Sequence, residues 1–173
     1  MKAGFHVDET LDEIIFRKQK EERACGKVFW GYSGTLCHPT KQIIPFVKKT
    51  LDRGTQPVLV LTSTPSKLVK PRRVAKEYST DGKKWITLPK GVLVAGSKYA
   101  IICRKLKVFS KEIDLSKFEV AAGPNSGKPL MEYLRHRIDK ACAFLSKKSV
   151  CKSAILKVNY IAKITEPYAV FLR

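Results

Sequence analysis

Side chains that could perform chemistry are concentrated in a short turn after the first β-prone stretch. Residues 27–32 are rich in aromatic and β-prone types and lead into Ser33-Gly-Thr-Leu-Cys-His38. Glycine lets the backbone approach a ligand closely, the hydroxyls of Ser33 and Thr35 could bind a phosphate together with backbone N–H groups, and His38 could transfer a proton. A tight turn with a capping hydroxyl and a solvent-facing histidine would use the same residues. We predict a functional site here because glycine, hydroxyl, thiol and imidazole groups share so few positions.

Hydroxyl groups also follow a second apolar stretch. The run at residues 57–61 breaks into Thr62-Ser-Thr-Pro-Ser66. If the sheet is parallel at this point, the end of this strand would lie beside the first turn, where open α/β sheets bind their ligands. Each hydroxyl alone would also fit a helix N-cap or a turn, but the two loops together favour a ligand site that includes Ser63.

A lysine and two tyrosines are further candidate binding residues. In Gly96-Ser-Lys-Tyr99, Lys98 lies beside small residues between two apolar stretches. It could contact a phosphate there, or be catalytic if it were desolvated. An exposed hairpin lysine is the alternative interpretation of the same pattern. Bases stack on exposed aromatic rings, and we expect Tyr32 and Tyr99 to serve in this way.

A third glycine-rich segment, Gly123-Pro-Asn-Ser-Gly-Lys128, lies between a predicted strand and a predicted helix. This is the context of an anion-binding nest. The segment resembles a P-loop, but its second glycine comes one residue early and Pro129 replaces the Ser or Thr that would hold magnesium. We therefore exclude hydrolysis of a nucleoside triphosphate. A capped helix start with a solvated basic face is the alternative to phosphate binding. The residues expected to bind nucleic-acid phosphates are Ser126, Lys128, Arg135 and Arg137.

Net charge indicates the partner more clearly than any motif. The chain of 173 residues contains 34 Lys and Arg against 15 Asp and Glu, a formal charge of +19. Such a charge attracts phosphate polymers and anionic surfaces, although it could also serve solubility alone. No apolar run of about 18 residues predicts a transmembrane helix. Neither a basic amphipathic helix nor a lipidation motif predicts binding to a membrane surface.

We therefore predict a nucleic-acid-binding protein. Helix-turn-helix, zinc-finger and RRM signatures are absent from the sequence, so RNA or flexible single strands are favoured over a sequence-specific duplex site. Lys and Arg would contact phosphates, and loop aromatics would assist. We expect the protein to belong to a larger ribonucleoprotein or to act on one. A basic scaffold without a pocket is a further alternative, which the clustering of Gly, Ser and Thr at strand ends disfavours.

The principal alternative is an enzyme that acts on a nucleotide or nucleic-acid substrate. Tyr32-Ser-Gly-Thr35, a helix, Leu61-Thr-Ser-Thr64 and then Glu119 follow one another in an order that resembles ADP-ribosyltransferase folds. Ser33 stands where such enzymes usually have His or Arg. The resemblance implies that Ser33, Ser63 and Glu119 converge on one pocket. The catalytic candidates of this alternative are Ser33, His38 and Glu119.

Cysteine and histidine patterns predict neither a metal site nor a disulfide framework. The five cysteines are odd in number and widely spaced without a Cys-x-x-Cys pair, and the three histidines lack the spacing of metal ligands. We expect most cysteines to be buried thiols, and we predict no cofactor. Free thiols indicate a reducing compartment, and residues 1–23 lack the apolar stretch of a signal peptide. These features predict an intracellular, cytoplasmic protein.

Hydrophobic periodicity predicts the elements that would position these groups. Helices are expected over residues 8–23, from about 44 to 53, and from about 130 to 146. A hairpin is predicted at Asp81-Gly82, which lies between two β-prone runs. Other strands are expected at residues 27–32, 57–61, 92–95, 99–103, 118–122, 156–164 and 168–172, the last two joined by a turn at Glu166-Pro167.

This mixture of elements predicts an α/β or α+β fold, in which a single mixed sheet is flanked by helices and a β-hairpin lies at the C-terminus. Hydrophobic residues make up 44% of the chain, which is enough for a globular core. We divide the chain into an N-terminal helical appendage, residues 1–26, and a single basic α/β domain, residues 27–173. Thr10 and Glu13 are expected to form a capping box at the start of the first helix.

Overall fold

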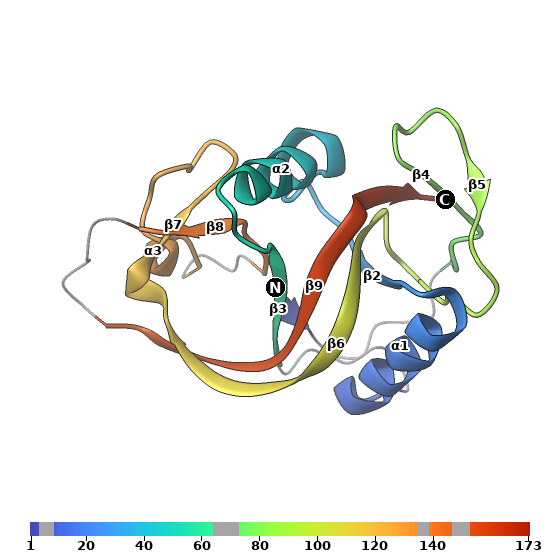
Figure 1. Ribbon diagram of the computed structural model, residues 1–173, viewed down its shortest axis with the longest axis horizontal. Coiled ribbons are helices and arrows are strands. Elements are labelled where there is room, and N and C mark those ends of the chain that lie inside the picture. The colour runs from blue at the N-terminus through green and yellow to red at the C-terminus, as the bar shows by residue number, and fades with distance from the viewer. Residues whose placement is uncertain (4–8, 64–72, 135–138, 147–152) are drawn as a thin grey trace.

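The computed structural model describes residues 1–3, 9–63, 73–134, 139–146 and 153–173. Its described part is an α+β fold around a mixed sheet of seven strands, as the sequence predicted, with a separate two-stranded sheet (Figure 1). None of the helices in these residues is long and apolar enough to cross a membrane.

One long strand, β9 (Ile155–Leu172), joins the parts of the main sheet. Along one edge it pairs antiparallel with the long strand β6 (Tyr99–Asp114). Along its other edge it pairs first with β3 (Val58–Ser63) and then, at its C-terminal end, with β4 (Glu77–Ser79). Backbone hydrogen bonds from one strand therefore fix the positions of three others.

Shorter strands extend this arrangement. β2 (Val28–Tyr32) pairs antiparallel with the first part of β6, and β1 (Lys2–Ala3) pairs parallel with β3. β5 (Ile86–Thr87) pairs antiparallel with β4, which confirms the predicted hairpin around Asp81-Gly82. In the separate sheet, β7 (Phe118–Val120) pairs with β8 (Ala143–Leu145).

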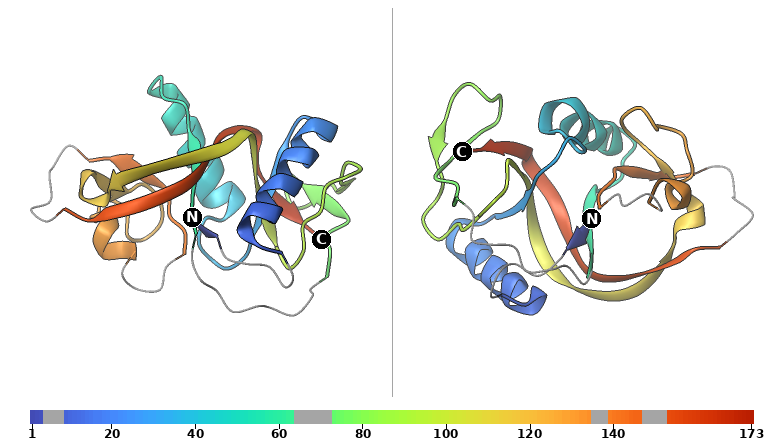
Figure 2. Two further views of the ribbon diagram at one scale, coloured as in Figure 1. Left: turned by 90° about the horizontal axis from the view of Figure 1, so that it is seen from below. Right: turned by 180° about the vertical axis from the view of Figure 1, so that it is seen from behind.

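The paired strands β6 and β9 form a ribbon that bends around β3 (Figure 1). Three register shifts interrupt their pairing, and at one of them Lys105 has a positive φ of 57°. The carboxylate of Glu22 accepts the N–H groups of Lys105 and Leu106 at 2.6 and 3.3 Å. Bulges bend the strand that carries them, so this contact holds the ribbon in its bent form. Figure 2 shows that α3 (Leu130–Leu134), β7 and β8 lie at one end of the ribbon, and α1 (Leu11–Cys25), β4 and β5 at the other.

The first helix, α1 (Leu11–Cys25), begins at the capping box that the sequence predicted. Thr10 and Glu13 form the reciprocal capping box, and Gly26 ends the helix in the left-handed conformation. Leu11, Ile14 and Ile15 on this helix are buried in the main core. The hydroxyl of Tyr160 on β9 donates a hydrogen bond to Asp12. Burial and the carboxylate of Asp12 together raise the pKa of Tyr160 to about 12.

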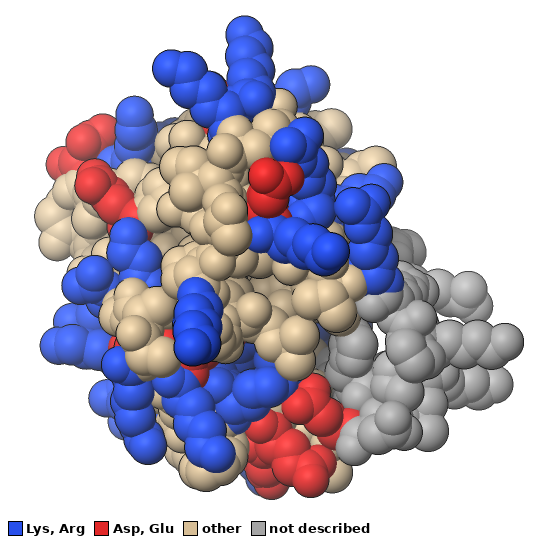
Figure 3. Space-filling model, turned by 90° about the vertical axis from the view of Figure 1, so that its right-hand side faces the viewer, with Lys and Arg blue, Asp and Glu red and all other residues tan. Residues whose placement is uncertain are grey.

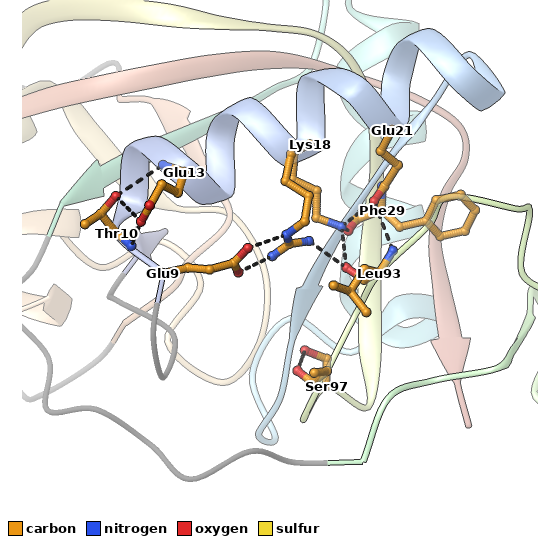
Figure 4. A network of polar contacts seen from close by, with 10 residues as sticks. Glu9, Thr10, Glu13, Lys18, Glu21, Phe29, Leu93 and Ser97 are labelled. Carbon is orange, nitrogen blue, oxygen red and sulfur yellow. Dashed lines mark hydrogen bonds and ion pairs between the residues drawn. The ribbon is translucent and has the colours of Figure 1, made fainter.

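The buried ion pair of Lys18 and Glu21 on α1 forms hydrogen bonds with the backbone of β2, as a neighbouring strand would. The ammonium of Lys18 donates to the carbonyl oxygen of Phe29 at 2.8 Å, and the carboxylate of Glu21 accepts the N–H of Phe29 at 2.7 Å (Figure 4). Lys18 also pairs with Glu21 at 2.7 Å and donates to the carbonyl of Leu93 at 3.0 Å. Burial lowers the pKa of Lys18, and the carboxylate of Glu21 opposes that shift. The pair satisfies backbone groups that β2 would otherwise leave buried and unpaired.

The sheet is covered on both faces near β2. Val28 and Trp30 point into the main core, whereas Phe29 points into a second cluster with Ile102 and Val170. The alternation of side chains along a strand produces this division. The second helix begins with a π-helical turn, η1 (Pro39–Ile43), and continues as α2 (Ile44–Asp52), close to the predicted start near residue 44.

The predicted helix over residues 130–146 was wrong for residues 139–146, and residues 135–138 lie outside the described residues. The helix α3 (Leu130–Leu134) is short, and residues 143–145 form the strand β8. The apolar residues between 130 and 145 have helical spacing, but β7 offers an open edge to which residues 143–145 add backbone hydrogen bonds. Tertiary pairing therefore overrides the local pattern.

Two predictions about strands were also wrong. Residues 156–172 do not form a C-terminal hairpin but one strand, because β6 pairs with β9 on both sides of Glu166-Pro167. Residues 165–168 bulge out instead, between the partners Ile164 and Ala169. Residues 92–95 form no strand, although Val94 is buried and Ala95 makes an isolated bridge to Val74. In β9, the bulge at residues 165–168 absorbs the extra residues without ending the strand.

We predict that Lys18→Met lowers the free energy of unfolding by about 3–5 kcal/mol, because it leaves the carboxylate of Glu21 buried without its counter-charge. Urea denaturation monitored by circular dichroism would measure the change. The matched control is Lys20→Met on the exposed side of the same helix, which should change stability by no more than about 0.5 kcal/mol. Equal effects of the two substitutions would contradict the role of the buried pair.

Candidate nucleic-acid interface

Three of the four candidate segments singled out in the sequence, those that contain glycine, meet at one pocket. Its volume is about 520 Å³, and it lies between the turn after β2, the start of β6 and the loop at residues 123–128. Predicted residues in its wall are Thr35, His38, Lys98 and Tyr99. The remaining lining residues are Gly34, Lys41, Gln42 and Gly123.

Aromatic rings form a cluster at this pocket. The ring of His38 lies 5.4 Å from that of Tyr99 and 5.4 Å from that of Phe171, centroid to centroid. Tyr32 packs against Tyr99 at 5.5 Å, but its own ring is only 6% exposed and its hydroxyl donates to the carbonyl of Cys37 at 2.6 Å. Burial raises the pKa of Tyr32 far above its ordinary value. Tyr32 therefore supports the cluster, while the half-buried His38 and Tyr99 remain accessible.

Hydrogen bonds fix the turn that carries His38. The side-chain oxygen of Gln42 accepts the N–H of His38 at 2.9 Å, and the carbonyl of His38 accepts the N–H groups of Gln42 and Ile43. The hydroxyl of Ser33 donates to the carbonyl of Gly96 at 3.0 Å and accepts the N–H of Lys98 at 3.1 Å. Ser33 thus joins the two loops that carry His38 and Lys98. π-Helical turns such as η1 occur frequently at functional sites.

The pocket is basic. Lys41 and Lys98 are both exposed, and none of the described residues in its wall is acidic. A Cβ atom at Gly123 would lie 2.7 Å from the side-chain nitrogen of Gln42, so the loop at residues 123–128 approaches the turn closely at this glycine. The pocket therefore combines two ammonium groups with aromatic rings.

The loop at residues 123–128 uses its backbone donors internally. The N–H groups of Ser126, Gly127 and Lys128 donate to carbonyl groups of the protein, so they do not form an open nest for an anion. The side chains of Ser126 and Lys128 are exposed and could still contact a phosphate. The predicted binding residues Arg135 and Arg137 lie outside the described residues.

The β4–β5 hairpin brings further lysines close to the aromatic cluster. Gly82 lies beside the ring of Phe171, with a Cβ position 3.7 Å away. The carboxylate of Asp81 accepts the N–H groups of Lys83 and Lys84 at 2.7 and 2.9 Å. These bonds, with one from the hydroxyl of Ser79, lower the pKa of Asp81 to about 2. Lys83 and Lys84 are both exposed at the tip of this hairpin.

Figure 3 shows the end of the molecule that carries this hairpin, the C-terminus and α1. Lys and Arg side chains are spread over most of this face, whereas Asp and Glu form a group at its lower edge and smaller groups at the upper left and above its centre. The positive charge predicted from the composition is therefore displayed on the same end as the hairpin tip.

Two predicted residues lie elsewhere. β2 and β3 are separated by β6 and β9 and run in opposite directions, so the parallel arrangement that would bring Ser63 beside the first turn does not occur. The N–H of Ser63 instead bonds the side chain of Asn159 at 2.9 Å. Glu119 belongs to the separate sheet and accepts a hydrogen bond from Ser146. Ser33, Ser63 and Glu119 therefore share no contact, and the convergence required by the enzymatic alternative is not seen.

Sequence reasoning missed Lys41, Gln42 and Phe171. The first two follow His38 within four residues and could have been included as part of the same turn. Phe171 reaches the site only because β9 pairs it with Tyr99, and the sequence around it contains no signal of that register.

Comparison of the chain with protein-family profiles, with curated proteins and with solved structures finds no match. Among the described residues, no three His, Cys, Asp or Glu side chains are grouped so that they could hold a metal ion. Hypotheses about function therefore depend on the geometry of the pocket and its charge.

We predict that the Asp81 carboxyl titrates at about pH 2. Because its pKa in the folded state is lower than the ordinary 3.8, its ionised form stabilises the hairpin fully above about pH 4, and this stabilisation is lost as the pH falls through 2. The amide NMR signals of Lys83 and Lys84 would follow the titration. In the Asp81→Asn control these signals should lose that transition, and a midpoint near pH 4 in the unmodified protein would contradict the prediction.

Proposed function

We propose that this protein binds single-stranded nucleic acid, with RNA as the favoured partner, at the pocket formed by residues 34–42, 98–99 and 123. The observation that carries this proposal is the position of Lys41 and Lys98 beside the accessible rings of His38 and Tyr99. Proteins that bind single strands combine basic grooves with aromatic side chains on which bases stack.

Each group of the pocket has a role in this proposal. The ammonium groups of Lys41 and Lys98 contact consecutive phosphates, and the hydroxyl of Thr35 donates to a phosphate oxygen. A base stacks against Tyr99 or His38. A base held within a duplex could not enter a pocket of this kind, which favours single strands or unpaired loops.

The outer surface of the β6–β9 ribbon offers a second observation in favour of a polyanion. Arg104 on β6 lies directly opposite Lys163 on β9, and both side chains are exposed. Like charges opposite one another destabilise a sheet. Lys107 and Lys111 add to the positive charge of β6, whereas Lys157 on β9 lies opposite Glu112. A bound phosphate backbone would reduce this repulsion.

The cellular setting forms part of the same proposal. The four described cysteines, Cys25, Cys37, Cys103 and Cys142, are free thiols, which a reducing compartment maintains. We place the protein inside the cell, in the cytoplasm, where it would belong to a larger ribonucleoprotein or act on one.

The proposal predicts a distinctive response to salt. Affinity for a short labelled single-stranded RNA should fall steeply with salt, and Lys41→Ala or Lys98→Ala should each reduce the magnitude of the log–log slope by about 0.7, the value expected for one phosphate contact on a single strand. Fluorescence anisotropy across a salt series would measure the slope. Lys128→Ala tests in the same way whether the loop at residues 123–128 contacts phosphate.

The control for these variants is Lys48→Ala, which changes an exposed lysine of α2 outside the pocket wall and should leave the slope nearly unchanged.

Tyr99→Leu should weaken binding by about 1–3 kcal/mol without changing the salt slope, because stacking does not release counterions. Absence of binding at low salt, or the same slope for Lys48→Ala and Lys98→Ala, would refute the proposed interface.

A further inference from the structure

A second cavity, of about 460 Å³, lies between the bent β6–β9 ribbon, β3 and α3. In the described part of the chain, it shares no lining residue with the basic pocket. Packed protein interiors leave few voids larger than a water molecule, whereas small-molecule sites typically have volumes of about 300–1,000 Å³. The size of the cavity therefore points to a ligand.

The wall of this cavity is mainly apolar. Val58 and Leu59 of β3, Ile113 of β6, Leu156 of β9 and Leu134 of α3 contribute to it. Several of these side chains stay partly uncovered in the fold, among them Val58, which is 40% exposed, and the half-buried Ile113, Leu134 and Leu156. An apolar ligand in the cavity would remove this surface from water, which is the main source of affinity in such sites.

Polar groups of the wall gather at one end. The pairing of β1 with β3 places Lys2 opposite Thr62, and the N–H of Lys2 donates to the carbonyl of Asp139 at 2.7 Å. The ammonium of Lys140 lies 2.6 Å from the carboxylate of Asp139. These four residues all line the cavity. Their side chains carry two positive charges and one negative charge. The amino group of Met1 also lines the cavity, but burial lowers its pKa to about 6, so it is largely uncharged at neutral pH. Among the described residues, this end of an otherwise apolar cavity is therefore positive.

We propose that this cavity binds a long-chain monocarboxylate, a free fatty acid. The hydrocarbon chain lies along the apolar wall formed by β3, β6, β9 and α3. The carboxylate lies at the positive end, where it accepts hydrogen bonds from Lys140 and Lys2. One net positive charge at one end matches a ligand with a single negative charge and a long apolar body, because a buried anion needs a charged or hydrogen-bonding partner.

The test is displacement of a fluorescent fatty acid from the full chain by palmitate. One palmitate should bind per chain. Hexadecanol, which has the same chain length without the charge, should bind roughly tenfold more weakly or worse, because it loses a charge-assisted hydrogen bond. Lysophosphatidylcholine, the phospholipid source of the same acyl chain, should compete no better than hexadecanol, because its headgroup also lacks the free carboxylate. Lysophosphatidylcholine that competes as well as palmitate would overturn the assignment to free fatty acids.

Two variants test separately the contacts of the ligand's hydrocarbon chain and those of its carboxylate. Ala143→Phe places a ring inside the cavity and should abolish displacement by both palmitate and hexadecanol, whereas the control Ala24→Phe, on the exposed surface of α1, should not. Lys140→Met should lower affinity for palmitate roughly tenfold and leave hexadecanol unchanged. It should also leave the fold intact, because Asp139 is 58% exposed and stays solvated.

Several results would overturn the proposal. These are failure of palmitate to displace the probe, equal affinities for palmitate and hexadecanol, or normal displacement in Ala143→Phe. The described residues that line the two cavities differ, although the ammonium of Lys140 also lies 3.7 Å from the Cβ position of Gly34 in the wall of the basic pocket. Ala143 lines the apolar cavity alone, so Ala143→Phe should abolish palmitate binding and leave RNA binding unchanged. Loss of both would show that this variant cannot separate the two proposals, whereas loss of RNA binding with palmitate binding retained would contradict the fatty-acid site.

Discussion

The backbone hydrogen bonds of β9 are the interactions on which the rest of the structure depends. This strand pairs with β6 along one edge and with β3 and β4 along the other, so it brings together segments that are far apart in the sequence. Through β6 it also fixes β2, and through β2 the turn that carries His38. Without this strand, neither the aromatic cluster nor the wall of the apolar cavity would form.

The sequence predicted features whose cause lies within a few residues. The capping box at Thr10, the hairpin at Asp81-Gly82 and the strand at residues 28–32 each follow from local hydrogen bonding or turn chemistry. The convergence of residues 32–38 and 96–99 on one pocket was not predicted, since each was singled out separately for its composition, and the pairing of β2 with β6 explains why they meet.

The sequence failed where distant segments decide the outcome. The strand β8 forms because β7 is available as a partner, and β9 passes through Glu166-Pro167 because β6 lies beside it. The apolar cavity was not predicted at all, because its wall comes from β3, β6, β9 and α3 and has no sequence pattern of its own. The buried pair Lys18 and Glu21 was likewise hidden in a stretch that looked uniformly charged and solvated.

The position of β9 in the chain has a consequence for the order of events during synthesis. Every strand that β9 joins leaves the ribosome before it does, so β3, β4 and β6 each have an open edge until residues 155–172 are made. Open edges pair readily with other chains, and sheets built from distant segments fold slowly. A net charge of +19 repels other copies of the chain, which opposes pairing between open edges during this interval.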